Sequence, residues 1–215
     1  MIIECKQPHR WNFDKSMLDK GEFRIQHNGN LNVKIVIDDE DYISSNRGGS
    51  LNHGTFVMES ILVTKRYYWN KSHDIVIHCR KPLKLLLIQC DKLMDSNISN
   101  VDKCSIIAKD IDNCKFSDMR ANIQVESMNN TYFHNVVNCL STKVPGEYLE
   151  YINAGNINNC SFVNCKNLNI KGYFENTKII DSMAKVSGSG EVGVVNGDVV
   201  AADYVDGGIT WSVKL

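Results

Sequence analysis

A short motif recurs along the second half of this 215-residue chain and constrains its fold more than any other feature. The motif is a small residue, any residue, a large apolar residue, any residue, and then Asn or Asp. Its clearest copies lie within Ile111–Met119 and Ile157–Cys165. Looser copies begin at Cys104, Thr131 and Thr177. Repeats of this kind indicate a fold built by stacking similar units.

The motif alternates as a β-strand does, because residues two apart in an extended chain share a face. Cys114 and Phe116 therefore point to one side, and Lys115 and Ser117 to the other. We expect the pairs of a small and a large residue to fill a narrow core. Asn or Asp then follows where the chain should turn, since both residues tolerate the left-handed region and bond to their own backbone. Asn residues in neighbouring units can also stack as amide ladders.

The copies are spaced 10, 17, 29 and 17 residues apart, counted between their small residues. This irregularity argues against a regular hexapeptide or leucine-rich array and favours a parallel β-helix whose coils differ in loop length. Some copies would then lie on different faces of one coil. Of the 24 asparagines, 16 fall between Asn97 and Asn176, which matches a chain rich in Asn turns. The alternative is an ordinary β-sandwich with short strands and Asn-rich turns.

Three segments are predicted from the limits of the repeat. Residues 1–30 do not share it and are expected to form an N-terminal cap or an attachment segment. Residues 31–182 are expected to form the solenoid. Residues 183–215 are expected to form an antiparallel hairpin that caps the solenoid or joins chains. Asn196-Gly197 is a strong hairpin signal, with Glu191–Val195 and Asp198–Ala202 as its strands.

Charge and hydropathy exclude several classes of function. A net charge of −1 and a pI near 6.6 give no basic footprint for nucleic acid. The longest apolar run, residues 85–88, is too short to span a bilayer, and no signal peptide is visible at the N-terminus. We therefore expect a soluble protein made in the cytoplasm, with no membrane span, no nucleic-acid partner and no cofactor.

The eight cysteines first suggest disulfides or a metal site. However, Cys104, Cys114 and Cys160 hold the same motif position, which is predicted to face inward. Buried thiols commonly pack as small apolar groups. No C-x-x-C pair and no His at finger spacing is present, so we predict no metal site.

The densest aromatic cluster, Arg66-Tyr67-Tyr68-Trp69, is the predicted glycan or partner surface. Aromatic residues are enriched where proteins meet partners. Four acidic residues at outward or turn positions are candidates for the carboxylate pair of a glycosidase: Asp110, Asp112, Asp118 and Glu126. Nothing in the sequence selects two of them, so no catalytic residue is assigned.

The copies at residues 113–118 and 159–164, with the Asn-, Lys- and Ile-rich composition, resemble the right-handed parallel β-helix segments of bacteriophage tail spikes, tail fibres and related virion proteins. The resemblance covers residues 75–182. It implies a trimer, contact with or cleavage of a bacterial surface glycan, and attachment to other tail proteins. We therefore expect a structural or adhesive tail protein of the virion, made in the host cytoplasm. A carbohydrate-active β-helix enzyme (a glycan hydrolase or lyase) and a cytoplasmic scaffold that polymerises end to end are the alternatives.

Overall fold

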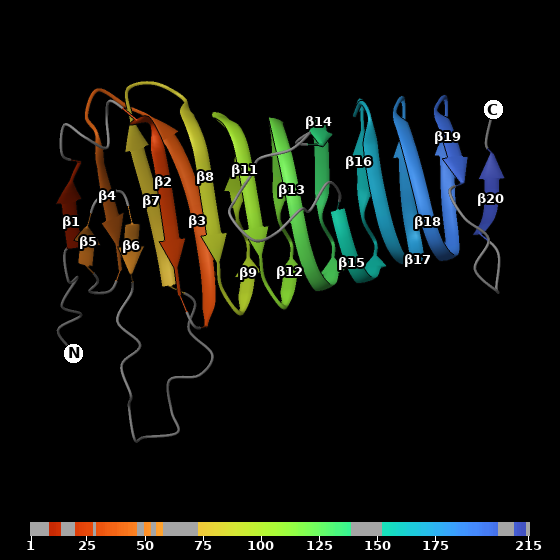
Figure 1. Ribbon diagram of the computed structural model, residues 1–215, viewed down its shortest axis with the longest axis horizontal. Coiled ribbons are helices and arrows are strands. Elements are labelled where there is room, and N and C mark those ends of the chain that lie inside the picture. Colours follow the sequence, from red (N-terminus) through yellow and green to blue (C-terminus); the bar gives the residue numbers. More distant parts are fainter. Residues whose placement is uncertain are drawn as a thin grey trace, which may run out of the picture.

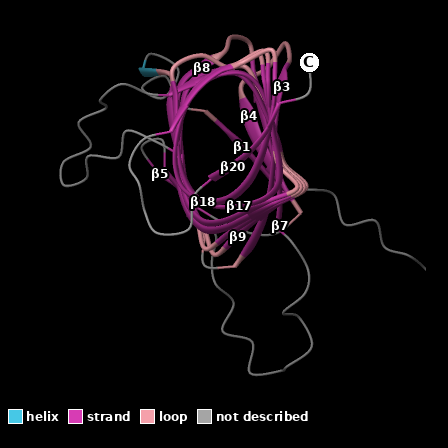
Figure 2. Ribbon diagram, turned by 90° about the vertical axis from the view of Figure 1, so that its right-hand side faces the viewer, coloured by secondary structure: helices cyan, strands magenta, loops and turns pink. Residues whose placement is uncertain are grey.

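The computed structural model describes residues 9–13, 20–27, 29–46, 50–52, 55–57, 73–138, 152–201 and 209–213. Within these ranges the chain forms twenty β-strands that join in one sheet. The prediction of an all-β protein is therefore confirmed. From β8 onward, successive strands lie side by side along the long axis of the molecule (Figure 1). Seen from the end, they surround a common interior (Figure 2).

The strands belong to three faces, which we call A, B and C in the order in which the chain visits them. Face A holds β2 (Glu22–Gln26), β6 (Thr55–Val57), β8 (Leu83–Gln89), β11 (Val101–Ile107) and β19 (Asp198–Ala201). Face B holds β9 (Lys92–Met94) and β12 (Asp110–Asp112). Face C holds β10 (Asn97–Ile98), β16 (Ser161–Val163) and most of β7 (His73–Cys79) and of β20 (Ile209–Val213), both of which begin in register with face B.

Six longer strands turn one or two corners and contribute to more than one face. They are β3 (Asn30–Ile37), β13 (Lys115–Asn129), β14 (Tyr132–Asn138), β15 (Ile152–Asn158), β17 (Leu168–Ile180) and β18 (Met183–Val195). Neighbouring coils pair in parallel on each face. The parallel pairing also includes β2 and β19, so it extends on both sides of the predicted segment 31–182.

The core follows the motif. On face C, Phe116 lies opposite Phe133, then Phe162, then Ile179, and all four are buried. The three phenyl rings stack, with centroids 5.0 Å and 4.7 Å apart. The small residues of the motif form a parallel column beside them, also buried: Ser96, Cys114, Thr131, Cys160 and Thr177. The expected narrow core of small and large pairs is confirmed.

Asn and Asp occupy the corners in the left-handed conformation, as the sequence predicts. Between faces B and C the corner residues are Asp95, Asn113, Asn130, Asn159 and Asn176, with φ of 46–51°. Between faces C and A they are Asn100, Asp118, Asn135, Asn164, Asp181 and Asn196, with φ of 48–60°. Amide ladders join some of them: the Nδ2 of Asn176 donates to the Oδ1 of Asn159 at 2.6 Å.

The irregular spacing has two causes. The copy at Cys104 lies on face A, whereas the other copies lie on face C. The 29-residue interval contains one ordinary coil plus the residues between β14 and β15. Ser96-Asn97-Ile98-Ser99-Asn100 is a further face C copy that the sequence reading did not identify.

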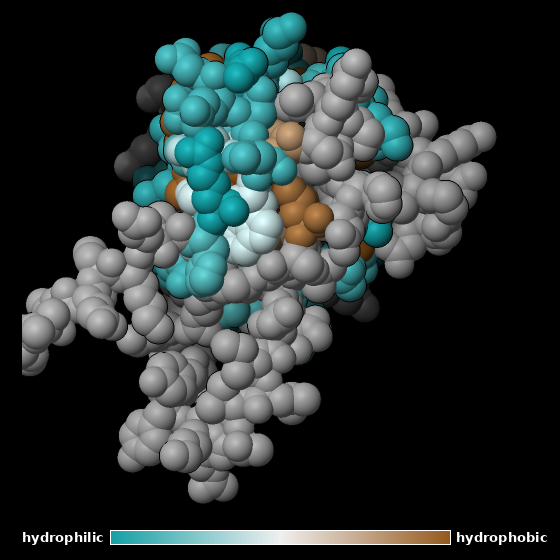
Figure 3. Space-filling view, turned by 90° about the vertical axis from the view of Figure 1, so that its left-hand side faces the viewer, coloured by the Kyte–Doolittle hydropathy of each residue, from teal (hydrophilic) through white to brown (hydrophobic). Residues whose placement is uncertain are grey.

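The N-terminal end contains antiparallel pairs. β1 (His9–Asn12) pairs with β4 (Tyr42–Ser45), which pairs with β7, and β5 (Ser50–Asn52) pairs with β6. The indole of Trp11 contacts Phe56 edge-on at 4.9 Å, and the ring of Phe13 lies 5.6 Å from that of Phe23. These aromatic groups pack against the core. Hydrophilic side chains cover much of the described part of this end, beside a smaller apolar area (Figure 3).

The predicted antiparallel hairpin near the C-terminus is wrong. β18 and β19 pair in parallel, with Met183 opposite Asp198, and β20 also pairs with β18 in parallel. Asn196 is the last residue of the corner column between faces C and A, with φ of 49°. An Asn in the left-handed region followed by a small residue suits a hairpin turn and this corner equally.

Candidate functional surface

The predicted surface at Arg66, Tyr67, Tyr68 and Trp69 lies outside the described residues. The candidate carboxylates are spread over three parts of the coil. Asp110 and Asp112 lie on β12 of face B, Glu126 lies where β13 passes from face A to face B, and Asp118 is a corner residue beyond face C.

Two of these carboxylates take part in contacts between coils. Asp112 accepts a hydrogen bond from the Nδ2 of Asn130 at 3.1 Å, and Lys92 lies 3.5 Å from it. Asp118 accepts from the Nδ2 of Asn135 at 2.8 Å. These contacts explain why acids occur at such positions, and they favour a structural role over a catalytic pair.

The thiols face inward, as predicted: Cys104, Cys114 and Cys160 are buried. Burial raises the pKa of the Cys114 and Cys160 thiols to about 11, and that of Cys90 to about 12. A thiol that stays protonated is a poor nucleophile and a poor metal ligand. Within the described ranges, no group of three or more His, Cys, Asp or Glu residues is placed to hold a metal ion.

His73 and His78, five residues apart, point to opposite sides of β7. The His73 ring is buried and stacks on that of His27 with centroids 4.2 Å apart. His78 faces outward, where its ring stacks on Tyr42 at 4.0 Å. The two histidines therefore belong to different environments.

A cross-strand cluster surrounds His78 on the outer surface of β1, β4 and β7. The guanidinium of Arg10 lies 3.7 Å from the centroid of the Tyr42 ring and also pairs with Glu40. The Nδ1 of His78 lies 2.8 Å from the Oδ2 of Asp38. This hydrogen bond is the main reason that the pKa of Asp38 is lowered. The cluster ties the antiparallel strands to the parallel stack.

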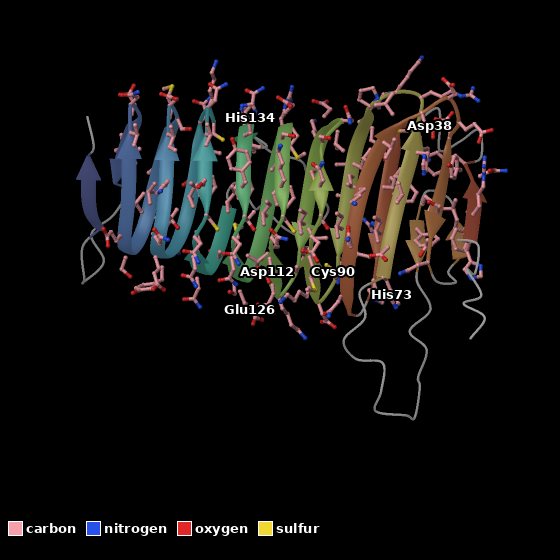
Figure 4. All side chains as sticks on the ribbon, turned by 180° about the vertical axis from the view of Figure 1, so that it is seen from behind. Asp38, His73, Cys90, Asp112, Glu126 and His134 are labelled. Atoms are coloured by element: carbon pink, nitrogen blue, oxygen red, sulfur yellow. The ribbon has the colours of Figure 1, made fainter. Side chains whose placement is uncertain are left out.

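A second aromatic and cationic group lies farther along the same face. Tyr132 is 36% exposed, and its ring is parallel to that of His134 within 8°, with centroids 6.3 Å apart. The Nζ of Lys115, one coil earlier, lies 5.8 Å from the Tyr132 ring centroid. His134 and Asp38 lie along one long edge of the molecule, opposite the edge that carries Asp112 and Glu126 (Figure 4).

Both groups belong to rows of outward-facing residues that run along face C. The pairing registers align the first row as Arg10, Ser44, Val76, Lys34, Asn97, Lys115, Tyr132, Ser161, Lys178 and Gly193. The registers align the second row in two parts. The part nearer the N-terminal end contains Asn12, Tyr42, His78 and Val36, and the part nearer the C-terminal end contains Ser117, His134, Val163, Ile180 and Val195. Neither row contains an acidic residue.

Sequence reasoning selected Lys115 and Phe133 only as part of the repeat and did not identify face C as a surface. The signal was present in the motif itself. The "any residue" positions on either side of Phe116 and Phe133 are the outward positions of face C. Their residues are Lys115 with Ser117, and Tyr132 with His134.

No protein-family model matches the chain, and no curated protein matches it. Among solved structures, it is similar to a candidate adhesin from Bacteroides fragilis, with a TM-score of 0.37 and 11% identity over 96% of this chain and 91% of that one. It is also similar to a candidate lipid-binding protein from Parabacteroides distasonis, with a TM-score of 0.29 and 14% identity over 97% and 94%. These remote similarities assign no function.

In the part of the chain that the structure describes, no helix has the length and apolar character needed to cross a bilayer.

Proposed function

We propose that this protein is a structural and adhesive component of a bacteriophage tail. In this proposal the chain is a right-handed parallel β-helix of the tail fibre or tail spike kind. Three copies associate, one end joins other tail proteins, and the lateral surface contacts the host. The protein is made in the host cytoplasm and acts in the virion.

The proposal rests on one observation: almost all of the described residues belong to coils that stack on one another. The registers on faces A, B and C continue from one coil to the next. The inward positions are packed, and the acids at Asp112 and Asp118 join adjacent coils. A rod of this kind displays long, flat lateral faces, which suits attachment better than chemistry in a cleft.

Immunoelectron microscopy of particles from a culture that makes the protein naturally tests the proposal. Antibodies raised against the purified chain should label phage tails at a fixed position. Labelling that is confined to the cytoplasm of uninfected, particle-free cells would contradict the proposal and favour a cytoplasmic scaffold.

A further inference from the structure

We propose that face C binds a linear anionic polysaccharide that lies along the long axis of the rod. This inference rests on the proposed function, since it names the class of glycan that the lateral surface contacts. Its basis is the combination of four features on one face: two outward rows without an acid, lysines without an acid partner, the spacing of these lysines and an exposed aromatic ring.

The first feature is the sign of the charge. The two outward rows of face C carry Arg10, Lys34, Lys115 and Lys178 but no acid, although the whole chain has a net charge of −1. Face B differs, because acids stand among its outward residues at Asp110 and Asp112. An anionic ligand therefore meets less repulsion on face C than on face B. Face A also carries outward basic residues, among them Lys103, Lys171 and Lys185, so the choice of face C rests on the combination of its charge with the features below.

The second feature is that the lysines of this row have no acid partner. Among the described residues, Lys34, Lys115 and Lys178 take part in no ion pair. By contrast, Lys92 lies 3.5 Å from Asp112 and Lys109 lies 3.0 Å from Asp91. Lysines that the protein does not neutralise are available to a ligand's carboxylates.

The acids nearest to face C stand at the corners. The carboxylates of Asp95 and Asp118 each accept a hydrogen bond from the Asn of the next coil, at 2.7 Å and 2.8 Å. Asp38 is hydrogen-bonded to His78. These partners hold the carboxylates at the edges of the face.

The third feature is the spacing along the rod. Parallel strands lie about 4.8 Å apart, so Lys34 and Lys115, two coils apart, are separated by about 10 Å. Lys115 and Lys178 are three coils apart, or about 14 Å. Intervals of two and three strand spacings along a straight row fit a polymer with an acidic group on each sugar.

Tyr132 stands in this row between Lys115 and Lys178. Its ring, with the parallel ring of His134, gives the face an apolar surface on which the C–H groups of a sugar can pack. Nucleic acid is a less suitable ligand, because single-strand binding relies on several stacking aromatic residues and a strongly basic groove.

The test measures binding of the full chain to oligogalacturonate by isothermal titration calorimetry, with the methyl-esterified oligomer as the neutral ligand of the same backbone. We expect binding of the acidic oligomer that weakens as salt rises, and much weaker binding of the ester. Tyr132→Ala and Lys115→Gln should each reduce affinity by about tenfold.

Tyr173→Ala and Lys185→Gln are the matched controls, because Tyr173 is exposed on face B and Lys185 lies on face A. They should leave binding unchanged. Thermal melting of every variant checks that the fold is intact.

Three results would overturn the inference: unchanged binding by Tyr132→Ala and Lys115→Gln, equal binding of the methyl ester, or tighter binding of single-stranded poly(dT). Each of these can occur while the chain still labels phage tails, so the inference can fail without the proposed function. If the chain binds oligogalacturonate through face C but labels no phage particle, the inference about face C holds and the proposed function is contradicted.

Discussion

Each corner residue between faces B and C is followed by a small residue that is buried. Cys160 follows the left-handed Asn159, and its Sγ donates to the carbonyl oxygen of Asn158 at 3.3 Å. Thr131 and Ser96 make the same bond to the carbonyl two residues earlier, at 2.8 Å and 2.9 Å. The small motif residue therefore fills the core and also donates to a carbonyl group, which for Asn158 and Asn129 accepts a backbone N–H of a neighbouring coil as well.

Substitutions of Asn164, whose φ is 52°, test whether the corner requires a residue that tolerates the left-handed conformation. Asn164→Ala should destabilise the protein by about 1–2 kcal/mol, because a Cβ without a polar group is strained in this region. Asn164→Gly relieves that strain and should cost less. Urea denaturation measures both, and equal losses for the two variants would contradict the proposed cause.

The buried thiols should resist modification in the folded protein. Iodoacetamide at pH 8, followed by peptide mass spectrometry, should leave Cys90, Cys114 and Cys160 unlabelled, whereas urea should make all three reactive. Labelling of Cys160 in the native protein, at the rate seen in urea, would show that the inward assignment is wrong.

The same raised pKa values predict the stability of the protein in alkali. Burial raises the pKa of the Cys114 and Cys160 thiols from the ordinary value of 9.0 to about 11 in the folded protein. Their contribution is fully present below pH 9 and is lost as the pH rises from 9 through 11, because the unfolded chain ionises first. Replacing Cys160 by Ser, which does not ionise in this range, should make the loss of stability above pH 9 less steep.

Among the elements, β13, β14 and β16 carry the phenyl stack at the centre of the molecule. Phe133 is fully buried between Phe116 and Phe162. Phe133→Ala should reduce the free energy of unfolding by about 3–5 kcal/mol, because it leaves a cavity that the stacked strands cannot close. Phe133→Leu should cost distinctly less. A loss below about 1 kcal/mol for the alanine variant would mean that the stack is not closely packed.

On face B, a ladder of side-chain amide hydrogen bonds joins Asn129 to Asn158 but does not continue to the next coil. The Nδ2 of Asn158 donates to the Oδ1 of Asn129 at 3.1 Å, while the buried Oδ1 of Asn158 has no hydrogen-bond partner among the residues that the structure describes. The next residue in that row is Glu175, whose carboxylate has no proton to donate.

Glu175→Asn should extend the ladder and stabilise the protein by about 1 kcal/mol, since it satisfies a buried acceptor. Glu175→Ala serves as the control, because it removes the charge without supplying a donor. If both variants raise the midpoint of urea denaturation equally, charge removal rather than the ladder is responsible.

The strands and corners were predictable where the motif recurs, because alternation and Asx turns are local properties. The assignment of copies to faces was not, since the Cys104 copy and the Cys114 copy look alike but belong to faces A and C. Face C as a surface was also missed, because its rows are formed by residues 17 or more positions apart that only the register brings into line.

At the scale of the whole molecule, the two ends differ in how the strands pair. The N-terminal end has antiparallel strands, and Trp11 and Phe13 pack against the core there. The C-terminal strands β19 and β20 continue the parallel pairing. Local turn chemistry could not reveal this difference, because the same Asn-Gly pair serves a hairpin and a corner. The roles of the end segments as cap, attachment site or oligomerisation site stay predictions.

Sedimentation velocity of the purified chain, alone and mixed with isolated bacterial envelopes, tests most directly whether the protein is an elongated attachment module. We predict an elongated trimer that moves to the pellet when envelopes of a recognised host are added. A compact monomer that stays in the supernatant with every envelope tested would contradict the proposed function.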